Sequence, residues 1–311
     1  MKICIILPAF NEEMTIEATI KDFHLHLPEG EIWVINNRST DATEKKALEI
    51  IERLGCKGGL INEKRAGKGN AMRRAFLEID ADIYLLADAD LTYPASEAHK
   101  LLKPLLSDEA DMVVGDRHSA GHYQAENKRA LHGFGNRVVR DLVNKLFNAE
   151  LADIMSGYRA LSRRFVKNYP ILVEGFEIET DMTLHALDKR FRILEIPTQY
   201  QDRPLGSFSK LNTISDGLRV LWTISNILRY YRPLAFFGSA AIITALFGLL
   251  AGFLPIQDWI LHRYIHHVPL AVLSASLEII AVILIAIGLI LDAITNQERR
   301  SFERLLLLSK K

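Results

Sequence analysis

The amino-acid sequence predicts an α/β protein with a doubly wound, mainly parallel sheet, followed by a hairpin of two membrane-spanning helices. Up to about residue 231, short apolar runs of strand length alternate with stretches whose apolar residues repeat at helical spacing, which is typical of a parallel sheet covered by helices. The run at residues 83–87 is apolar on both faces, as expected of a strand in the middle of such a sheet. Beyond residue 231, two long segments carry almost no charge, and each reaches the roughly 20 residues of helix that cross a bilayer.

The elements follow one another along the first part of the chain. The predicted strands are residues 2–7, 32–35, 58–61, 83–87, 111–115 and 192–196. The predicted helices have apolar residues three or four apart and cover residues 16–27, 72–79, 129–147, 178–190 and 211–229. Another helix is expected after residues 39–41, which offer good N-cap residues. Residues 153–159 are predicted to form a polar turn.

Composition narrows the class of protein. The 311 residues include 38 basic and 38 acidic side chains, so no global charge points to a nucleic-acid partner. This length allows one large or two ordinary domains. Cys4 and Cys56 form neither a metal-binding spacing nor a disulfide framework, which fits a reducing compartment. A strand-like run follows Met1 directly, so no secretory signal is expected.

Two acids, Asp88 and Asp90, follow the central apolar run directly. In open α/β sheets, ligands bind at the carboxyl ends of the strands. Alternate residues of an extended chain point the same way, so the two carboxylates form a hard oxygen site suited to Mg²⁺ or Mn²⁺ and shared with substrate phosphates. Considered alone, the pair is equally compatible with a solvated strand end.

Other polar clusters also follow predicted strands. They are the loop at Asn11, the loop at Asn36 and the turn at residues 115–117. Because parallel strands bring these positions to one edge of the sheet, the acids and the surrounding basic loops are expected to lie together. Such an edge suits a nucleotide diphosphate.

The two apolar segments, residues 234–254 and 268–294, are predicted to be transmembrane helices joined by a loop at residues 255–267. A buried helical hairpin of a soluble domain is the alternative. Basic residues flank the outer ends of the pair: Arg229, Arg232, Arg299, Arg300, Arg304, Lys310 and Lys311. The positive-inside rule therefore predicts both termini in the cytoplasm. The amphipathic residues 211–229 are expected to lie along the cytoplasmic interface.

Several short motifs, taken together and in this order, resemble the family 2 glycosyltransferases, and within them the polyprenyl-phosphate sugar transferases of the dolichyl-phosphate mannose synthase type. They are Pro-Ala-Phe-Asn-Glu at 8–12, Ser-Thr-Asp at 39–41, Gly-Lys-Gly-Asn-Ala at 67–71, Asp-Ala-Asp at 88–90, Gly-Asp-Arg at 115–117, Asp153 with Ser-Gly-Tyr-Arg at 156–159, and Arg203 with Gly206 and Ser-Lys-Leu at 209–211. The resemblance implies a GT-A fold, a divalent cation (Mg²⁺ or Mn²⁺), a nucleotide-sugar donor and a lipid-phosphate acceptor.

On the donor side, Pro8, Phe10, Glu12 and Asn36 match the family's nucleoside pocket. Glu12 is expected to hold ribose hydroxyls, or else is a first-turn helix acid favoured by the helix dipole. Lys68 matches the loop that approaches the donor. There, the flanking glycines would let backbone N–H groups come near phosphate while the lysine supplies charge. A solvated basic loop is the alternative.

Asp88 and Asp90 match the metal and diphosphate site. The basic residues that match the acceptor-phosphate side are Arg117, Arg129 and Arg203, with Lys210 assisting. A guanidinium grips phosphate oxygens bidentately, unlike a lysine. Asp153 matches an acid near the reacting centre. The alternative is that Asp153 only caps the turn that follows it. Glu179 is a second such acid, or a helix-start acid.

The chain departs from the family pattern at two points. Asn36 and Asn37 stand where the family often has two acids. An amide still accepts from a base N–H and also donates, so UDP and GDP both stay open. Thr92 stands where the mannose synthases have a metal-binding glutamine, which weakens a mannose-specific interpretation.

The expected reaction is inverting transfer of a hexose from a UDP- or GDP-sugar to a polyprenyl phosphate, with Asp90, Asp153, Arg117 and Arg203 as catalytic residues. The phosphate is anionic at pH 7 and needs little help from a base. Residues 203–210 are expected to act as a lid. One alternative is transfer to a lipid hydroxyl, which would require Asp153 or Glu179 as base. Another is a non-catalytic nucleotide-sugar-binding membrane subunit.

The expected organisation is a cytoplasmic catalytic domain at residues 1–210, an interfacial helix at 211–232, two transmembrane helices within 233–295 and a basic cytoplasmic tail at 296–311. The protein is expected in the inner (plasma) membrane as a multi-pass protein. The expected partners are the donor, the lipid acceptor and the bilayer, without nucleic acid, and a homo-oligomer is possible.

Overall fold

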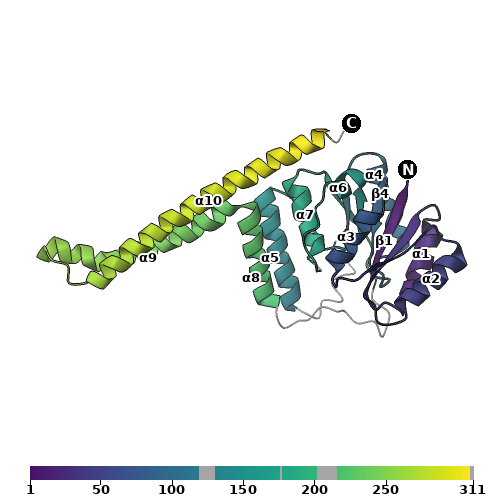
Figure 1. Ribbon diagram of the computed structural model, residues 1–311, viewed down its shortest axis with the longest axis horizontal. Coiled ribbons are helices and arrows are strands. Elements are labelled where there is room, and N and C mark those ends of the chain that lie inside the picture. Colours follow the sequence, from purple (N-terminus) through teal and green to yellow (C-terminus); the bar gives the residue numbers. More distant parts are fainter. Residues whose placement is uncertain (119–129, 176, 202–215, 309–311) are drawn as a thin grey trace. The chain divides into compact units, whose positions relative to one another are not determined.

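The computed structural model describes residues 1–118, 130–175, 177–201 and 216–308 (Figure 1). The chain divides into two compact units, Met1–Asp216 and Gly217–Lys311. Each unit is considered separately below.

The first unit is built on a seven-stranded sheet with the order β3-β2-β1-β4-β6-β5-β7. The strands are β1 (Ile3–Ala9), β2 (Glu31–Asn37), β3 (Gly58–Glu63), β4 (Ile83–Leu86), β5 (Met112–Asp116), β6 (Arg159–Ser162) and β7 (Ile193–Pro197). All neighbours are parallel except β6, which runs antiparallel to both β4 and β5. The predicted mainly parallel sheet is therefore confirmed.

The strand β6 was not predicted, because its first residue, Arg159, was assigned to a polar turn. It is only four residues long and begins with a fully buried arginine, so no apolar run marks it. Ala160 pairs with Leu85 of β4 on one side and with Val113 of β5 on the other. This strand therefore joins the two parallel parts of the sheet.

Helices cover both faces of the sheet, as the doubly wound pattern requires. They are α1 (Ile16–His26), α2 (Thr43–Leu54), α3 (Lys68–Glu78), α4 (Ala98–Leu106), α5 (Ala130–Phe147), α6 (Arg163–Lys167) and α7 (Ile178–Asp188), with a 3₁₀ turn at η1 (Ala95–Glu97). In Figure 1, α1 and α2 lie on one side of β1 and α3 on the other.

Alternate residues of the strands serve the two faces. Ile5 and Leu7 of β1 belong to one buried cluster with the apolar sides of α1, α2 and α4. On the other face, Tyr84 of β4 meets Phe76 of α3 edge to face, with ring centroids 5.7 Å apart. Two buried layers therefore hold the sheet and bring the ends of its strands into register.

The second unit contains α8 (Asp216–Tyr231), α9 (Pro233–His262) and α10 (Val268–Leu308). Both α9 and α10 are long and apolar enough to cross a membrane. They form a hairpin, in which the Ser274 hydroxyl donates to the Gly248 carbonyl at 2.8 Å. Because α9 continues past Pro255 to His262, the connecting loop is shorter than the predicted residues 255–267. Residues 295–308 extend α10.

Candidate functional site

The loops after β1 and β2 are hydrogen-bonded to each other at the carboxyl ends of the strands. Asn11 has a left-handed backbone (φ 53°), and its Oδ1 accepts from the Thr40 N–H at 2.7 Å. The Glu12 N–H donates to the Thr43 hydroxyl at 2.8 Å. The loop after β4 joins this edge, since the Thr15 hydroxyl donates to the Ala89 carbonyl at 2.7 Å. The polar loops therefore gather as the sequence analysis expected.

The predicted nucleoside-pocket residues lie on these loops. Phe10 is exposed. Pro8 lines a small hollow with Lys68 and Asp88. Glu12 lies four positions before the first residue of α1, and its carbonyl accepts from the Ile16 N–H at 2.9 Å. The acid in the first turn of α1 is Glu17, so Glu12 is not the first-turn acid of the alternative, and its role toward ribose hydroxyls stays a prediction.

Asn36 and Asn37 at the end of β2 are buried. The amide of Asn36 donates to the Asn62 Oδ1 at 2.7 Å. Asn37 accepts from the Gly67 N–H at 2.8 Å and donates to the Arg65 carbonyl at 2.6 Å. Asn36 therefore joins the end of β2 to β3, and Asn37 joins it to the loop that contains Gly67.

The two glycines around Lys68 have a structural role that the sequence analysis did not predict. A Cβ at Gly67 or Gly69 would lie 2.1 Å from a backbone oxygen of residues 173–175. The Gly69 N–H donates to the Glu174 carbonyl at 2.9 Å, and the Gly67 N–H is bound to Asn37. These glycines allow two backbone segments to touch, and their own N–H groups are engaged within the protein.

Lys68 itself is the cation at the centre of this half of the site. Its Nζ lies 2.5 Å from the Asp88 Oδ1 and 2.5 Å from the Glu179 Oε1. Burial opposes a charge on Lys68, but the two carboxylates outweigh it and raise the pKa of the ammonium. Gly157 closes this pair, because a Cβ there would lie 3.1 Å from both Lys68 Nζ and Asp88 Oδ2.

Asp90, two positions after Asp88, is buried, and Thr92 orients it. The Oδ1 of Asp90 accepts from the Thr92 hydroxyl at 2.6 Å and from the Thr92 N–H at 3.1 Å. Within the described residues, no group of three or more His, Cys, Asp or Glu side chains is suited to a metal. Two carboxylates at one strand end still fit Mg²⁺ or Mn²⁺, since such ions are commonly held by one or two carboxylates plus substrate phosphates.

The second half of the site is an ion pair between Arg117, which follows β5, and Asp153. Two bonds join them, Nε to Oδ2 at 2.6 Å and Nη2 to Oδ1 at 2.9 Å. Burial would raise the pKa of Asp153, but the Arg117 guanidinium outweighs it and lowers that pKa. Glu195 of β7 supports the turn by accepting from the Asp153 N–H at 2.8 Å.

Tyr93 links the two halves and was missed by the sequence analysis. Its hydroxyl accepts from the Gly157 N–H at 3.0 Å. Its ring meets the Tyr200 ring edge to face, with centroids 5.5 Å apart, and the Arg117 guanidinium lies 5.7 Å from the centroid of Tyr200. Burial raises the pKa of Tyr93. The two ion pairs therefore belong to one site. The only signal in the sequence was an aromatic residue three positions after Asp90.

Arg159 is a second residue whose role was missed. It is fully buried and donates to the carbonyls of Ile154 and Ser156, both at 2.8 Å, and to the Thr183 hydroxyl at 2.9 Å. A single guanidinium therefore shapes the turn that carries Asp153. The motif containing Arg159 was recognised, but its structural purpose was not.

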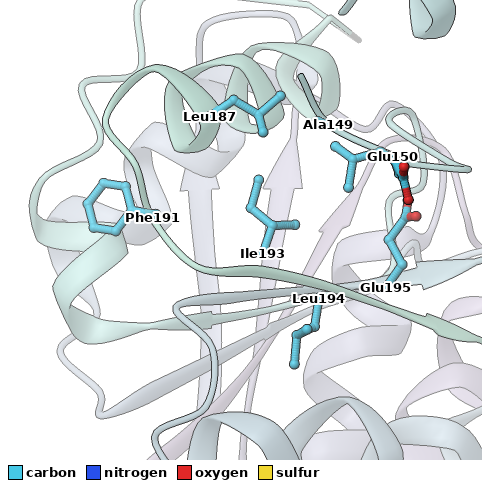
Figure 2. A pocket seen from close by; sticks show the side chains of 8 residues that line it. Ala149, Glu150, Leu187, Phe191, Ile193, Leu194 and Glu195 are labelled. Atoms are coloured by element: carbon cyan, nitrogen blue, oxygen red, sulfur yellow. The ribbon is translucent and has the colours of Figure 1, made fainter. Parts of the chain in front are cut away.

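A second hollow of the first unit is shown in Figure 2. It has a volume of about 530 Å³ and is lined by Ala149, Glu150, Leu151, Leu187, Phe191, Ile193, Leu194 and Glu195. Figure 2 shows Glu150 and Glu195 at one end of it and Phe191 at the other. It shares Glu195 with the Asp153 turn, and its walls are otherwise mainly apolar.

Three of the predicted acceptor-side residues, Arg129, Arg203 and Lys210, lie outside the described residues. Gln201, the last described residue before the second of these gaps, donates its N–H to the Thr92 carbonyl at 3.0 Å. The chain therefore reaches that stretch from beside Asp90.

The mainly parallel seven-stranded sheet, covered by helices and carrying polar loops at its strand ends, is a GT-A type nucleotide-sugar transferase fold. A solved structure supports this fold: the glucosyl-3-phosphoglycerate synthase of Mycobacterium tuberculosis, bound to Mn²⁺, UDP and glucosyl-3-phosphoglycerate, matches with a TM-score of 0.55 and 22% identity, over 73% of this chain and 78% of that one.

The sequence comparisons identify the family. The model described as glycosyl transferase family 2 matches residues 4–169, and the chain belongs to that family. Glycosyltransferase AglJ of Haloferax volcanii is 31% identical over 97% of both chains. The dolichol-phosphate mannosyltransferase of Pyrococcus furiosus is 27% identical over 72% of this chain and 64% of its own length. The expected glycosyltransferase class is confirmed.

Proposed function

We propose that this protein transfers a hexose from a UDP- or GDP-sugar to a polyprenyl phosphate at the cytoplasmic face of the membrane, with inversion at the anomeric carbon. Its membership of glycosyl transferase family 2 supports the reaction class. Its similarity to a dolichol-phosphate mannosyltransferase supports a lipid-phosphate acceptor. The two apolar helices support a membrane site.

The observation that carries the choice of acceptor is the pairing of both candidate bases with cations. Asp153 is bound twice by Arg117, and Glu179 is bound by Lys68. The lowered pKa of Asp153 makes it a weak proton acceptor. A lipid hydroxyl needs a base to become nucleophilic, whereas a phosphate monoester is already anionic. The site therefore favours the phosphate.

On the donor side, the Lys68 ammonium is held near the acid pair, where it can bind a diphosphate oxygen. Asp88 and Asp90 are the residues that would hold Mg²⁺ or Mn²⁺. When bound, the cation supplies Lewis-acid stabilisation of the charge on the departing diphosphate. Phe10 and the Asn36 loop border the position proposed for the nucleoside.

In the proposed step, an oxygen of the lipid phosphate bonds to the anomeric carbon while the bond from that carbon to the diphosphate breaks. The nucleoside diphosphate leaves with the electron pair, and no proton has to move. Asp153 orients the guanidinium of Arg117, and Arg117 is proposed to hold the lipid phosphate in line with the bond that breaks. Arg203, Arg129 and Lys210 are proposed to complete the acceptor side.

The test is a donor screen with the purified full-length protein, Mn²⁺, undecaprenyl phosphate and a panel of UDP- and GDP-sugars, with the products identified by mass. A lipid-phosphate hexose from one donor is expected. Asp90→Asn should lower transfer at least about 100-fold, because it removes charge from the cation and diphosphate site. Asp80→Asn is the matched control, since Asp80 is a surface acid paired with Arg163.

Two results would contradict the proposal. Product on diacylglycerol or ceramide, and none on the lipid phosphate, would assign the enzyme to lipid hydroxyls. Nucleotide binding without transfer from any donor to any lipid would indicate a non-catalytic subunit.

A further inference from the structure

The ion pair between Lys68 and Asp88 raises the question of how a divalent cation reaches its carboxylate. We propose that Lys68 is a built-in counter-ion that occupies Asp88 until the nucleotide diphosphate arrives, and that Glu179 is the positioning residue that retains Lys68 throughout. This inference rests on the proposed function, because it takes Asp88 and Asp90 as the site of the cation.

The geometry shows one ammonium shared by two acids. Lys68 Nζ is 2.5 Å from an oxygen of each carboxylate, and the Lys68 side chain is only 13% exposed. The two acids differ in exposure, since the side chain of Asp88 is 30% exposed and that of Glu179 is 8% exposed. Asp88 is therefore the partner that a ligand from solvent can reach.

The elements that carry Lys68 and Glu179 are fastened to each other. Lys68 begins α3 and Glu179 lies in the first turn of α7. The backbone of residues 173–175, which precedes α7, touches the glycines on both sides of Lys68 so closely that no Cβ would fit. The Gly69 N–H also donates to the Glu174 carbonyl. The ion pair between Lys68 and Glu179 is therefore expected to persist when the ion pair between Lys68 and Asp88 breaks.

An ammonium and a divalent cation on the same carboxylate repel each other strongly in a partly buried site. A divalent cation that binds without nucleotide must either displace Lys68 from Asp88 or bind beside it against that repulsion. Its affinity is therefore low. A nucleotide diphosphate changes the balance, because its oxygens supply negative charge to both cations. Lys68 then moves its second contact from Asp88 to the diphosphate, while Glu179 keeps it in place. Cation and nucleotide should consequently bind with strong mutual enhancement.

The test measures Mn²⁺ binding to the purified full-length protein without nucleotide, from the loss of the free Mn²⁺ signal in electron paramagnetic resonance. The informative variant is Lys68→Met combined with Glu179→Gln. It removes one positive and one negative charge, so the net charge is unchanged. The carboxylate that loses its ion pair is Asp88, which is the more exposed of the two acids. The proposal expects this double variant to bind Mn²⁺ at least tenfold more tightly than the wild type.

A second measurement adds UDP or GDP at saturation. The nucleotide that binds should tighten Mn²⁺ binding by a larger factor in the wild type than in the double variant, because only the wild type has a counter-ion to relocate. Lys64→Met, in the exposed part of the same loop, is the control and should behave as the wild type. In the single variant Glu179→Gln the enhancement should shrink, and Glu179→Asp should restore part of it.

Equal Mn²⁺ affinity in the wild type and a folded double variant would overturn the proposal. So would tight Mn²⁺ binding that survives Asp90→Asn in the double-variant background, since the ion would then be elsewhere. Neither readout depends on the sugar or the acceptor. Sugar transfer by a wild type whose Mn²⁺ affinity equals that of the double variant would overturn this inference and leave the proposed function standing.

Discussion

At the scale of single residues, the site is defined by two cations, each bound to carboxylates. Arg117 orients Asp153, and Lys68 joins Asp88 to Glu179. The sequence analysis named each of these residues, because motif spacing indicates chemistry. It did not pair them, since the partners lie between 20 and 111 positions apart in the chain and meet only through the sheet.

Gly157→Ala is expected to impair donor binding without unfolding the protein. The added methyl would lie 3.1 Å from Asp88 Oδ2 and Lys68 Nζ, and the backbone there is held by the bond from the Gly157 N–H to Tyr93. The ion pair must shift by a few tenths of an ångström, which should raise the donor KM by about tenfold. Steady-state kinetics and the melting temperature together check this.

Gly59→Ala serves as its control. A Cβ at Gly59 meets only Trp33, at an ordinary contact distance of 3.6 Å, so the kinetics should stay as in the wild type. An unchanged donor KM in Gly157→Ala would show that the ion pair between Lys68 and Asp88 tolerates the added methyl. Donor binding would then not depend on the close approach of residue 157.

At the scale of elements, the turn from residue 153 to β6 and the helix α7 form the frame behind the site. Arg159 binds the turn to Thr183 of α7. Close to it, α7 carries His185, whose ring lies among Phe165, Tyr169 and Phe191 at centroid distances of 5.9, 5.1 and 6.0 Å. The frame is therefore a buried, largely aromatic region that contains one titratable imidazole.

This region should make stability depend on pH. Burial lowers the pKa of His185 to about 4 from its ordinary 6.5, so between those values the unfolded chain binds a proton that the folded chain does not. The stabilisation is present above pH 6.5 and is lost as the pH falls toward 4. Between pH 7.5 and pH 5, His185 should account for a loss of about 2 kcal/mol.

Thermal unfolding of the detergent-solubilised protein at these two pH values checks the expectation. His185→Gln, which cannot titrate, should lose less stability than the wild type over the same interval. An equal loss in both proteins would mean that other groups, such as the buried carboxylates, carry the dependence.

At the scale of the whole molecule, a catalytic unit is joined to an apolar hairpin. The hairpin interface uses small residues: Gly288 approaches Leu234 and Phe237, and Gly252 approaches Ser274. The basic residues lie at the outer ends of the two helices, and the tip between them, residues 263–267, has a single arginine. This distribution favours a cytoplasmic location for the catalytic unit and both termini.

The proposed topology can be tested by cysteine labelling of intact cells with a membrane-impermeant maleimide. Cys56→Ser provides the background, because Cys4 is buried and burial raises the pKa of its thiol to about 12, which makes it unreactive. Tyr264→Cys at the exposed tip should be labelled in intact cells. Ser301→Cys near the other end of α10 should be labelled only after lysis.

Labelling of Ser301→Cys in intact cells, with Tyr264→Cys protected, would reverse the orientation. Protection of both until lysis would place the hairpin entirely inside the cell. Either result would remove the membrane face from the proposed function.

The sequence by itself determined the class of fold, the family, the acid pair and the two apolar helices, because periodicity, motif order and apolar length are local properties of a chain. Only the tertiary structure decided what the motifs do to one another. It placed Lys68 between two acids, turned the glycines beside it toward residues 173–175, and placed β6 between β4 and β5 with Arg159 buried behind the site. These outcomes depend on contacts between residues distant in sequence, and a buried ion pair or a close backbone approach leaves no local pattern by which it can be recognised.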